Sequence, residues 1–81
     1  MEIQNGCRAE YGPLELRIQA TARVNGFTVY VDDPRREQPS VLDGAVQSTL
    51  ESAKEYVVLK AGEYLTSLKE DAPHEPEWRC S

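Results

Sequence analysis

Residues 14–31 read LELRIQATARVNGFTVYV, and this stretch decides the fold class. In its first half, apolar side chains alternate without a break with polar ones, which is typical of a strand with one dry face and one solvated face. The dipeptide Asn25-Gly26 then favours a two-residue type I′ turn, after which the alternation resumes. We therefore predict a β-hairpin with strands at 14–24 and 27–32.

A two-residue turn would fix the register of this hairpin and place all its apolar side chains on one face. The predicted cross-strand pairs are Val24–Phe27, Ala22–Val29 and Ala20–Val31. Together with two side chains nearer the start of the hairpin, they would form the sheet half of the core: Leu16, Ile18, Ala20, Ala22, Val24, Phe27, Val29 and Val31.

A second periodic pattern follows the polar connection 33–39. Apolar residues recur there in steps of three and four, the spacing of one face of a helix: Leu42, Val46, Leu50, Ala53, Val57, Ala61, Tyr64 and Leu68. They predict one long helix at about 41–69 with Ser40 as its N-cap, and the first six would supply the helix half of the core. Gly62 and the strand-favouring segment 56–59 leave a break near Gly62 open.

These two patterns predict a two-layer α+β fold, in which an antiparallel sheet packs on one long helix. At 81 residues the chain is one domain, with residues 1–69 as the folded unit. Residues 70–81 are interpreted as an acidic, proline-containing tail, in which Trp78 and Cys80 could be the inward positions of a short terminal strand. Strand order and the structure of residues 1–12 stay open.

The composition excludes several classes of protein. The net charge is −5, opposite to the balance of a protein that coats nucleic acids. No segment approaches the roughly 20 apolar residues of a membrane span, and the first residues lack the blocks of a signal peptide, so we expect a cytoplasmic protein without membrane contact. Two cysteines are too few for a disulfide scaffold. We expect Cys7 and Cys80 to be reduced thiols, which meet only if the chain ends share a sheet edge.

The residue pattern does not point to an enzyme. The single histidine, His74, lies in the tail between Pro73 and Glu75, where a general base would lack a fixed position. Cys7, His74 and Cys80 lack the close pairs in which structural zinc ligands are normally spaced. We expect no catalytic residue, no metal and no cofactor.

Protein–protein contact is the function that we favour from the sequence. Val58, Leu59 and Leu65 lie outside the main stripe of the predicted helix, and a small sheet keeps open edges. Either feature could hold a protein partner or, as a homodimer, a second copy of the chain. Strands from the termini could instead cover the three side chains.

The alternative function is nucleic-acid binding by the solvated side of the hairpin and the loop after it. The candidate residues combine cations with one exposed aromatic ring: Arg17, Arg23, Tyr30, Arg35 and Arg36. Such side chains can hold phosphates and stack a base. Neighbouring carboxylates dilute the positive field, so a solvated face of mixed charge is the favoured interpretation.

The order of elements also resembles a known family. A strand, a tight turn, the segment Gly26–Asp32, a polar loop and a helix with Leu50–Ala53 resemble the partial RNase H-like domain of HicB-type antitoxins over residues 14–69. The resemblance implies an oligomeric module that blocks a small basic toxic RNase, which suits an acidic inhibitor. Pro34–Arg36 stands where the family usually has a Pro-Gly-Cys-type segment, and no appended DNA-binding segment is evident. Because the antitoxin domain is not expected to be an active nuclease, the resemblance carries over no catalytic residue, and without an appended segment it carries over no DNA-binding role.

Overall fold

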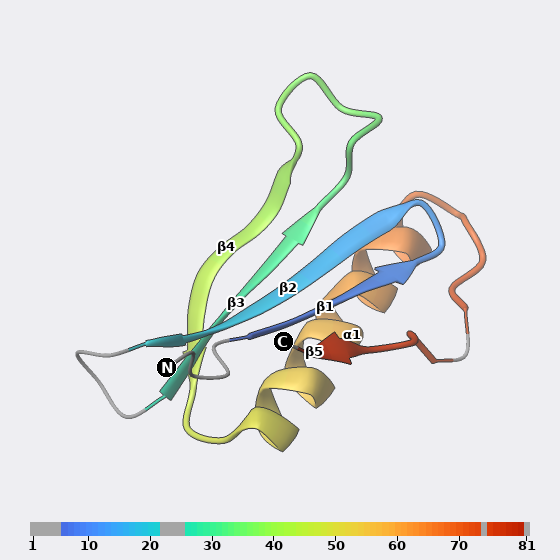
Figure 1. Cartoon of the computed structure of the whole chain (residues 1–81). Coiled ribbons are helices and arrows are strands. Elements are labelled where there is room, and N and C mark those ends of the chain that lie inside the picture. The colour runs from blue at the N-terminus through green and yellow to red at the C-terminus, as the bar shows by residue number, and fades with distance from the viewer. Residues whose placement is uncertain (1–5, 22–25, 74, 81) are drawn as a thin grey trace.

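A sheet and one helix make up the computed structural model, which describes residues 6–21, 26–73 and 75–80. Within these ranges the elements are β1 (Gly6–Tyr11), β2 (Leu14–Thr21), β3 (Gly26–Asp32), β4 (Ser40–Gln47), α1 (Leu50–Ser67) and β5 (Arg79–Cys80). The strands pair antiparallel in the order β4-β3-β2-β1-β5 (Figure 1). Because α1 packs on one face of this sheet, the predicted two-layer α+β fold is confirmed.

The predicted hairpin forms from β2 and β3, but in a different register. Ile18 pairs with Val29 and Leu16 pairs with Val31, so each β3 residue lies opposite a β2 residue four positions earlier than a two-residue turn requires. A shift by an even number keeps the same side chains on the dry face. For Val29 and Val31 it also replaces an alanine neighbour by a larger side chain, which buries more apolar surface. The predicted turn residue Asn25 lies outside the described residues.

The first part of the predicted helix is a strand. Residues 40–47 form β4, and its first residue is Ser40, the predicted N-cap. The helix α1 begins only at Leu50. Thr49 is the N-cap, and its side chain accepts a hydrogen bond from the Ser52 backbone N–H at 3.0 Å, which satisfies one of the free donors of the first turn.

Two bulges explain why β4 does not alternate in sequence. Opposite β3, the register shifts by one residue at Gly44 and again at Val41. Each extra residue interrupts the period of two, so the apolar positions of β4 imitate the spacing of a helix. Gly44 has a positive φ of 87°, a conformation that glycine adopts readily. Periodicity alone does not detect a strand interrupted in this way.

The helix α1 is continuous from Leu50 to Ser67, and Gly62 does not break it. A Cβ at Gly62 would lie 3.7 Å from the Tyr11 hydroxyl, an ordinary contact distance, so the glycine is not required by space. The buried stripe of α1 faces the sheet and comprises Ala53, Val57, Ala61 and Leu65. The described residues contain no helix that combines the length and the hydrophobicity of a membrane span.

The core lies between α1 and the dry face of the sheet. Its fully buried side chains come from β2, β3 and α1: Leu14, Leu16, Ile18, Val29, Val31, Ala53, Val57, Ala61 and Leu65. Phe27, Leu42 and Leu50, three predicted members, pack against this core while partly exposed.

Two predicted core residues are exposed instead. Ala20 lies near the end of β2, beyond the side chains that α1 covers. Val46, predicted on the helix, belongs to β4 and pairs with Thr28, which places it on the face of the sheet away from α1. Two further predicted members, Ala22 and Val24, fall outside the described residues.

The two chain ends meet at one edge of the sheet. β5 pairs with β1, and a disulfide joins Cys7 to Cys80 across this pair, with Cα atoms 3.9 Å apart. The prediction of reduced thiols is therefore wrong. The two cysteines do lie at a shared sheet edge, which is the arrangement that we expected to be necessary for them to meet. Trp78, predicted to point inward, is partly buried against the core, and the Tyr11 hydroxyl donates to the Pro73 carbonyl at 2.9 Å. The acidic tail is thus tied to the domain.

A charged open face as the candidate functional site

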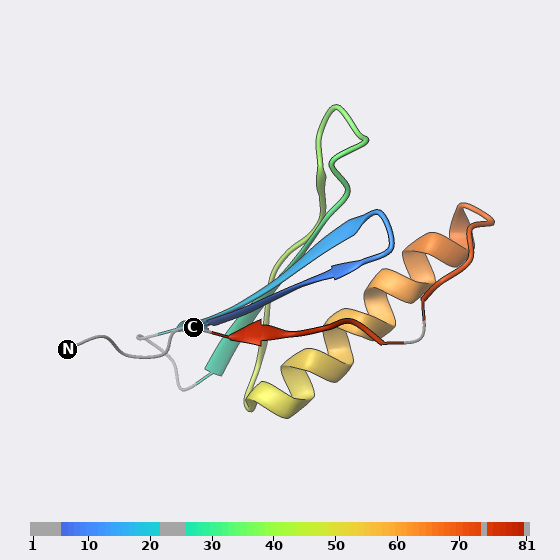
Figure 2. The ribbon, with the colours of Figure 1, turned by 45° about the vertical axis from the view of Figure 1, so that its right-hand side comes forward.

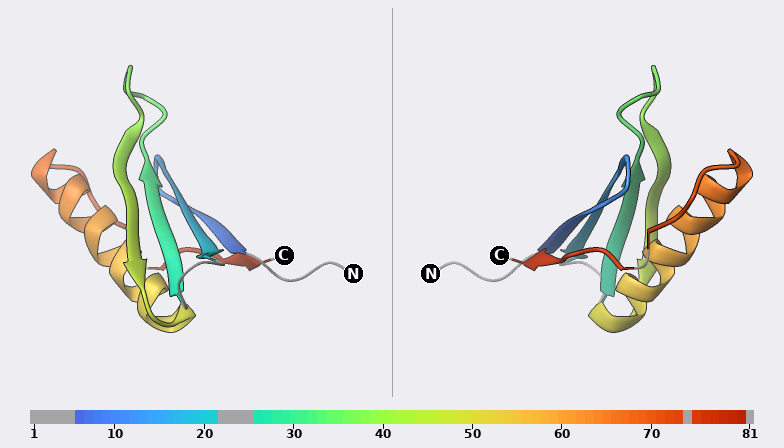
Figure 3. Two further views of the ribbon diagram at one scale, coloured as in Figure 1. Left: turned by 90° about the vertical axis from the view of Figure 1, so that its left-hand side faces the viewer. Right: turned by 90° about the vertical axis from the view of Figure 1, so that its right-hand side faces the viewer.

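One face of the sheet has no covering element in the described part of the chain. Figures 2 and 3 show α1, together with the segment that leads to β5, on the other side. Because side chains alternate along each strand, the polar positions of β1, β2 and β3 project to the uncovered side. We term this surface the open face.

Three arginines form a row across the open face. Arg8 of β1 lies directly opposite Arg17 of β2 on one side and opposite Arg79 of β5 on the other. Like charges in directly opposite positions destabilise a sheet. These three residues are termed the arginine row.

Three carboxylates form a second row beside the first. Glu15 of β2 lies opposite Glu10 of β1 on one side and opposite Asp32 of β3 on the other. These three residues are termed the acidic row. On β1 and β2, each glutamate is two residues from an arginine, so the rows run side by side about 7 Å apart.

Most charges of the two rows are unpaired within the described chain. Arg17 is paired, because its Nη2 lies 3.5 Å from Oδ2 of Asp32 and its Cζ lies 4.7 Å from the centre of the Tyr30 ring. No ion pair in the described residues involves the other four members, Arg8, Arg79, Glu10 and Glu15. The open face therefore presents separated positive and negative charge to the solvent.

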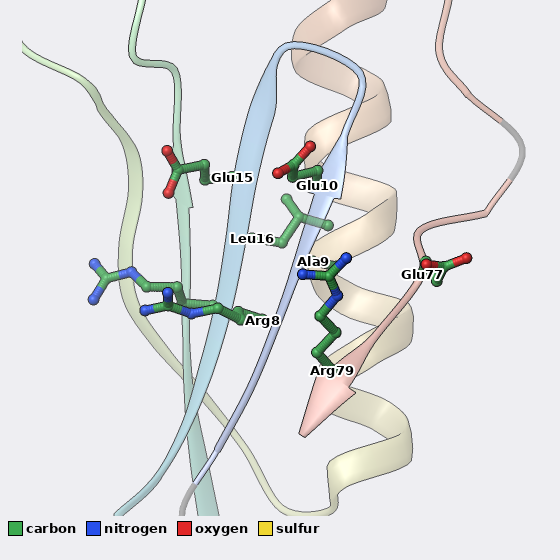
Figure 4. Close-up of a pocket in the computed structure, with 8 residues that line it drawn as sticks. Arg8, Ala9, Glu10, Glu15, Leu16, Glu77 and Arg79 are labelled. Carbon is green, nitrogen blue, oxygen red and sulfur yellow. The ribbon is translucent and has the colours of Figure 1, made fainter. Parts of the chain in front are cut away.

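A hollow of about 320 Å³ is lined by the arginine row and by the two glutamates of the acidic row. Figure 4 shows Glu10 and Glu15 at one level along the strands and Arg8 and Arg79 at the next. Glu77, from the segment before β5, also lines this hollow. Its lining can meet a surface that carries both signs of charge.

The residues predicted for nucleic-acid binding do not form one surface. Arg17 and Tyr30 are cross-strand neighbours on the open face, as the prediction requires. Arg35 and Arg36 lie in the loop between β3 and β4, and Arg35 is bound by carboxylates. Arg23 lies outside the described residues.

Arg35 belongs to a clasp that ties this loop to the end of α1. Its Nε and Nη2 donate to the two carboxylate oxygens of Asp33 at 2.9 Å each, and its Nη1 donates to Glu70 at 3.1 Å. The Tyr64 hydroxyl donates to Asp33 at 2.8 Å. Hydrogen bonds from Arg35, followed by that from Tyr64, hold the pKa of Asp33 well below its usual range, although burial raises it. The clasp, Asp33, Arg35, Tyr64 and Glu70, is thus a satisfied structural network.

The structure separates the three residues predicted as an apolar partner surface. Leu65 is fully buried, so its prediction as a surface residue is wrong: it continues the stripe of α1 four residues after Ala61. Leu59 is 57% exposed, and Val58 is partly buried against the core. Both line a shallow groove of about 560 Å³ next to Tyr11. The predicted apolar surface is therefore smaller than the sequence suggested.

The sheet edges are poorly suited to adding a further strand. β4 has bulges at Val41 and Gly44, and bulges twist an edge away from a regular partner. At the opposite edge, β5 has two residues. The open face is consequently the regular surface of the sheet that no element covers in the described part of the chain.

Comparison with known proteins assigns no family to this chain. No protein-family model matches it, and no curated protein or solved structure matches it significantly. Among the described residues, no group of three or more His, Cys, Asp or Glu side chains is placed to hold a metal ion. His74 lies outside these residues.

One sequence signal could have revealed the arginine row. Each cysteine has an arginine as its neighbour, in Cys7-Arg8 and in Arg79-Cys80. An antiparallel pair of strands that places the cysteines opposite each other also places these arginines opposite each other. The row therefore depends on the pairing of the two chain ends, which are far apart in the sequence.

Proposed function

We propose that this chain is a non-enzymatic protein-interaction module that docks its partner on the open face. The observation that carries the proposal is the charge pattern, a row of three arginines beside a row of three carboxylates. Folding alone does not favour this pattern, because like charges lie directly opposite each other in both rows. A docked surface of complementary charge would relieve the repulsion and supply the missing ion pairs.

The same pattern favours a protein over a nucleic acid. Duplex DNA carries one negative charge per roughly 1.7 Å, so a strand laid along the arginine row would also run beside the acidic row. The net charge of −5 adds repulsion at longer range. The stacked pair Arg17–Tyr30 is the part of the open face that would suit a base, and it makes nucleic-acid binding the alternative outcome of the test below.

Antitoxin-like inhibition would be one form of the proposed function. The resemblance to HicB-type antitoxins implies a basic enzyme as the partner, and the acidic row would be the part of the open face that meets it. A cytoplasmic location stays a prediction. Disulfides such as Cys7–Cys80 are more frequent in oxidising compartments than in the cytoplasm. Whether the two cysteines are oxidised or reduced in cells is therefore a test of that location.

A capture experiment with matched charge reversals tests the proposal. The tagged full chain is incubated with native extract, with and without nuclease, and the bound proteins are quantified by mass spectrometry. Glu10→Arg alters the acidic row, whereas Glu55→Arg alters an exposed position of α1. Both substitutions change the net charge equally, so the second controls for a general charge effect.

We expect a protein that is bound equally by the wild type and by Glu55→Arg. Its capture should fall at least about tenfold with Glu10→Arg and should not change with nuclease. Equal capture by all three chains would contradict docking on the open face. Capture that nuclease abolishes would contradict a protein partner and support the nucleic-acid alternative.

A further inference from the structure

We infer that the partner that occupies the open face is a second copy of this chain. The inference rests on the proposed function and specifies its partner. The arginine row and the acidic row are adjacent, parallel and opposite in sign. A surface with this pattern is complementary to itself.

A two-fold axis between the rows, parallel to them, brings two open faces together in register. The rotation exchanges the two sides of the axis, so the arginine row of each copy faces the acidic row of the other. β1 and β2 contribute to both rows. Arg8 therefore faces the second copy's Glu10, and Arg17 faces the second copy's Glu15. Symmetry repeats both contacts, so that each of the opposed charges on β1 and β2 gains a partner of opposite sign.

This arrangement agrees with the way in which sheets pack face to face. The rows run across the strands, so rotation about an axis parallel to them keeps the strands of the two sheets within about 30° of each other. A specific interface buries about 800 Å² per partner, roughly a seventh of the 5799 Å² that this chain exposes.

Other partners fit less of the surface. A uniformly basic protein would be attracted by the acidic row and repelled by the arginine row, and a polyanion would meet the reverse problem. A partner must carry both rows in the reverse order, and a second copy does so by symmetry.

Reversal of each side of one inferred ion pair tests this geometry. Dimerisation of the full chain is measured by sedimentation velocity over a concentration series in about 20 mM NaCl, where charges are weakly screened. In a dimer of Arg8→Glu, a carboxylate faces another carboxylate at both symmetric contacts between residues 8 and 10. In a dimer of Glu10→Arg, a guanidinium group faces another guanidinium group at the same two contacts. Each variant alone should dimerise at least about tenfold more weakly than the wild type.

An equimolar mixture of the two variants should recover the dimer. In the mixed dimer every altered contact again joins opposite charges, so the affinity should return to within about threefold of the wild type. Damage to folding would not be repaired by mixing. A change in net charge would not explain weaker association of Glu10→Arg, because this substitution lowers the net negative charge and so reduces the repulsion between copies. Lys69→Glu and Glu55→Arg, exposed positions outside the two rows, serve as matched controls and should leave the affinity unchanged.

The pair on β2 repeats the test if circular dichroism shows that Arg8→Glu or Glu10→Arg disturbs the fold. Arg17→Glu and Glu15→Arg should likewise dimerise only when mixed. A wild type that stays monomeric, a dimer that survives both reversals, or a mixture that stays monomeric would overturn the inference. If the wild type captures a different protein that Glu10→Arg does not capture, the proposed function stands with that protein as the partner. Equal capture by all variants would remove the proposed function as well.

Discussion

The two faces of the sheet are built in opposite ways. The covered face carries aliphatic side chains that α1 buries completely: Leu16, Ile18, Val29 and Val31. The open face carries two rows of charge, in which four of six members form no ion pair within the described chain. The first face is covered by the chain itself, and we propose that a partner covers the second. We therefore expect substitutions to divide into those that change stability and those that change docking.

The largest effect should come from the disulfide, which contributes to both faces. Cys7 and Cys80 are separated by 73 residues, and chain entropy gives about 4 kcal/mol for closing such a loop. Reduction, or the double substitution of both cysteines by serine, should lower the free energy of unfolding by up to this amount in a urea titration. Because β5 carries Arg79, the arginine row should lose one of its three members as well. An unchanged unfolding midpoint under reducing conditions would contradict the attachment of β5 to β1.

A truncation on the covered side should change stability alone. Leu65→Ala removes a fully buried side chain from α1 and should cost about 3 kcal/mol of unfolding free energy. Leu59→Ala, on the same helix at a position that is 57% exposed, should cost less than about 1 kcal/mol. Chemical denaturation measures both variants, and sedimentation of the folded fraction should give wild-type affinity. Weakened association of folded Leu65→Ala would break the division between the faces.

The clasp at the end of β3 should give a smaller, pH-dependent effect. Asp33→Asn weakens the hydrogen bonds from Arg35 and Tyr64, and we expect a loss of about 2 kcal/mol at neutral pH. Because the folded pKa of Asp33 is depressed, its contribution is present above the unfolded value of about 4 and is lost as pH falls below it.

The pH profile distinguishes the clasp from general acid denaturation. Unfolding free energies of the wild type and of Asp33→Asn, measured between about pH 6 and about pH 2, should converge as the pH falls. Parallel profiles would mean that Asp33 is not the group that loses its contribution in acid.

The parts of the fold that the sequence predicted are those with local patterns. The alternation in residues 14–31 predicted the β2–β3 hairpin, and the spacing from Ala53 to Ala61 predicted the buried stripe of α1. β4 was mistaken for helix because the bulges at Val41 and Gly44 remove its alternation. The predicted register of the hairpin was wrong by four residues. A period of two determines which face of the sheet a side chain lies on, but it does not determine which residue of the neighbouring strand lies opposite.

The candidate site was less predictable because it is assembled from both chain ends. The solvated face of β2 and the neighbouring Arg17 and Tyr30 followed from alternation. The rows themselves need β1 and β5 beside β2, and the pairing of Cys7 with Cys80 that brings them there spans nearly the whole chain. No local pattern in the sequence encodes that contact.

The smallest change in stability is expected where the change in docking is largest. Arg8→Glu turns the repulsion between residue 8 and its two cross-strand neighbours, Arg17 and Arg79, into attraction. The monomer should therefore be as stable as the wild type or up to about 1 kcal/mol more stable. The same substitution should abolish association through the open face.

Unfolding free energy at low concentration and sedimentation at high concentration, measured on the same preparation of Arg8→Glu, test the central claim most directly. We predict a chain that is at least as stable as the wild type and no longer dimerises. A destabilised chain, or one that still dimerises like the wild type, would show that the arginine row serves the fold and not a partner.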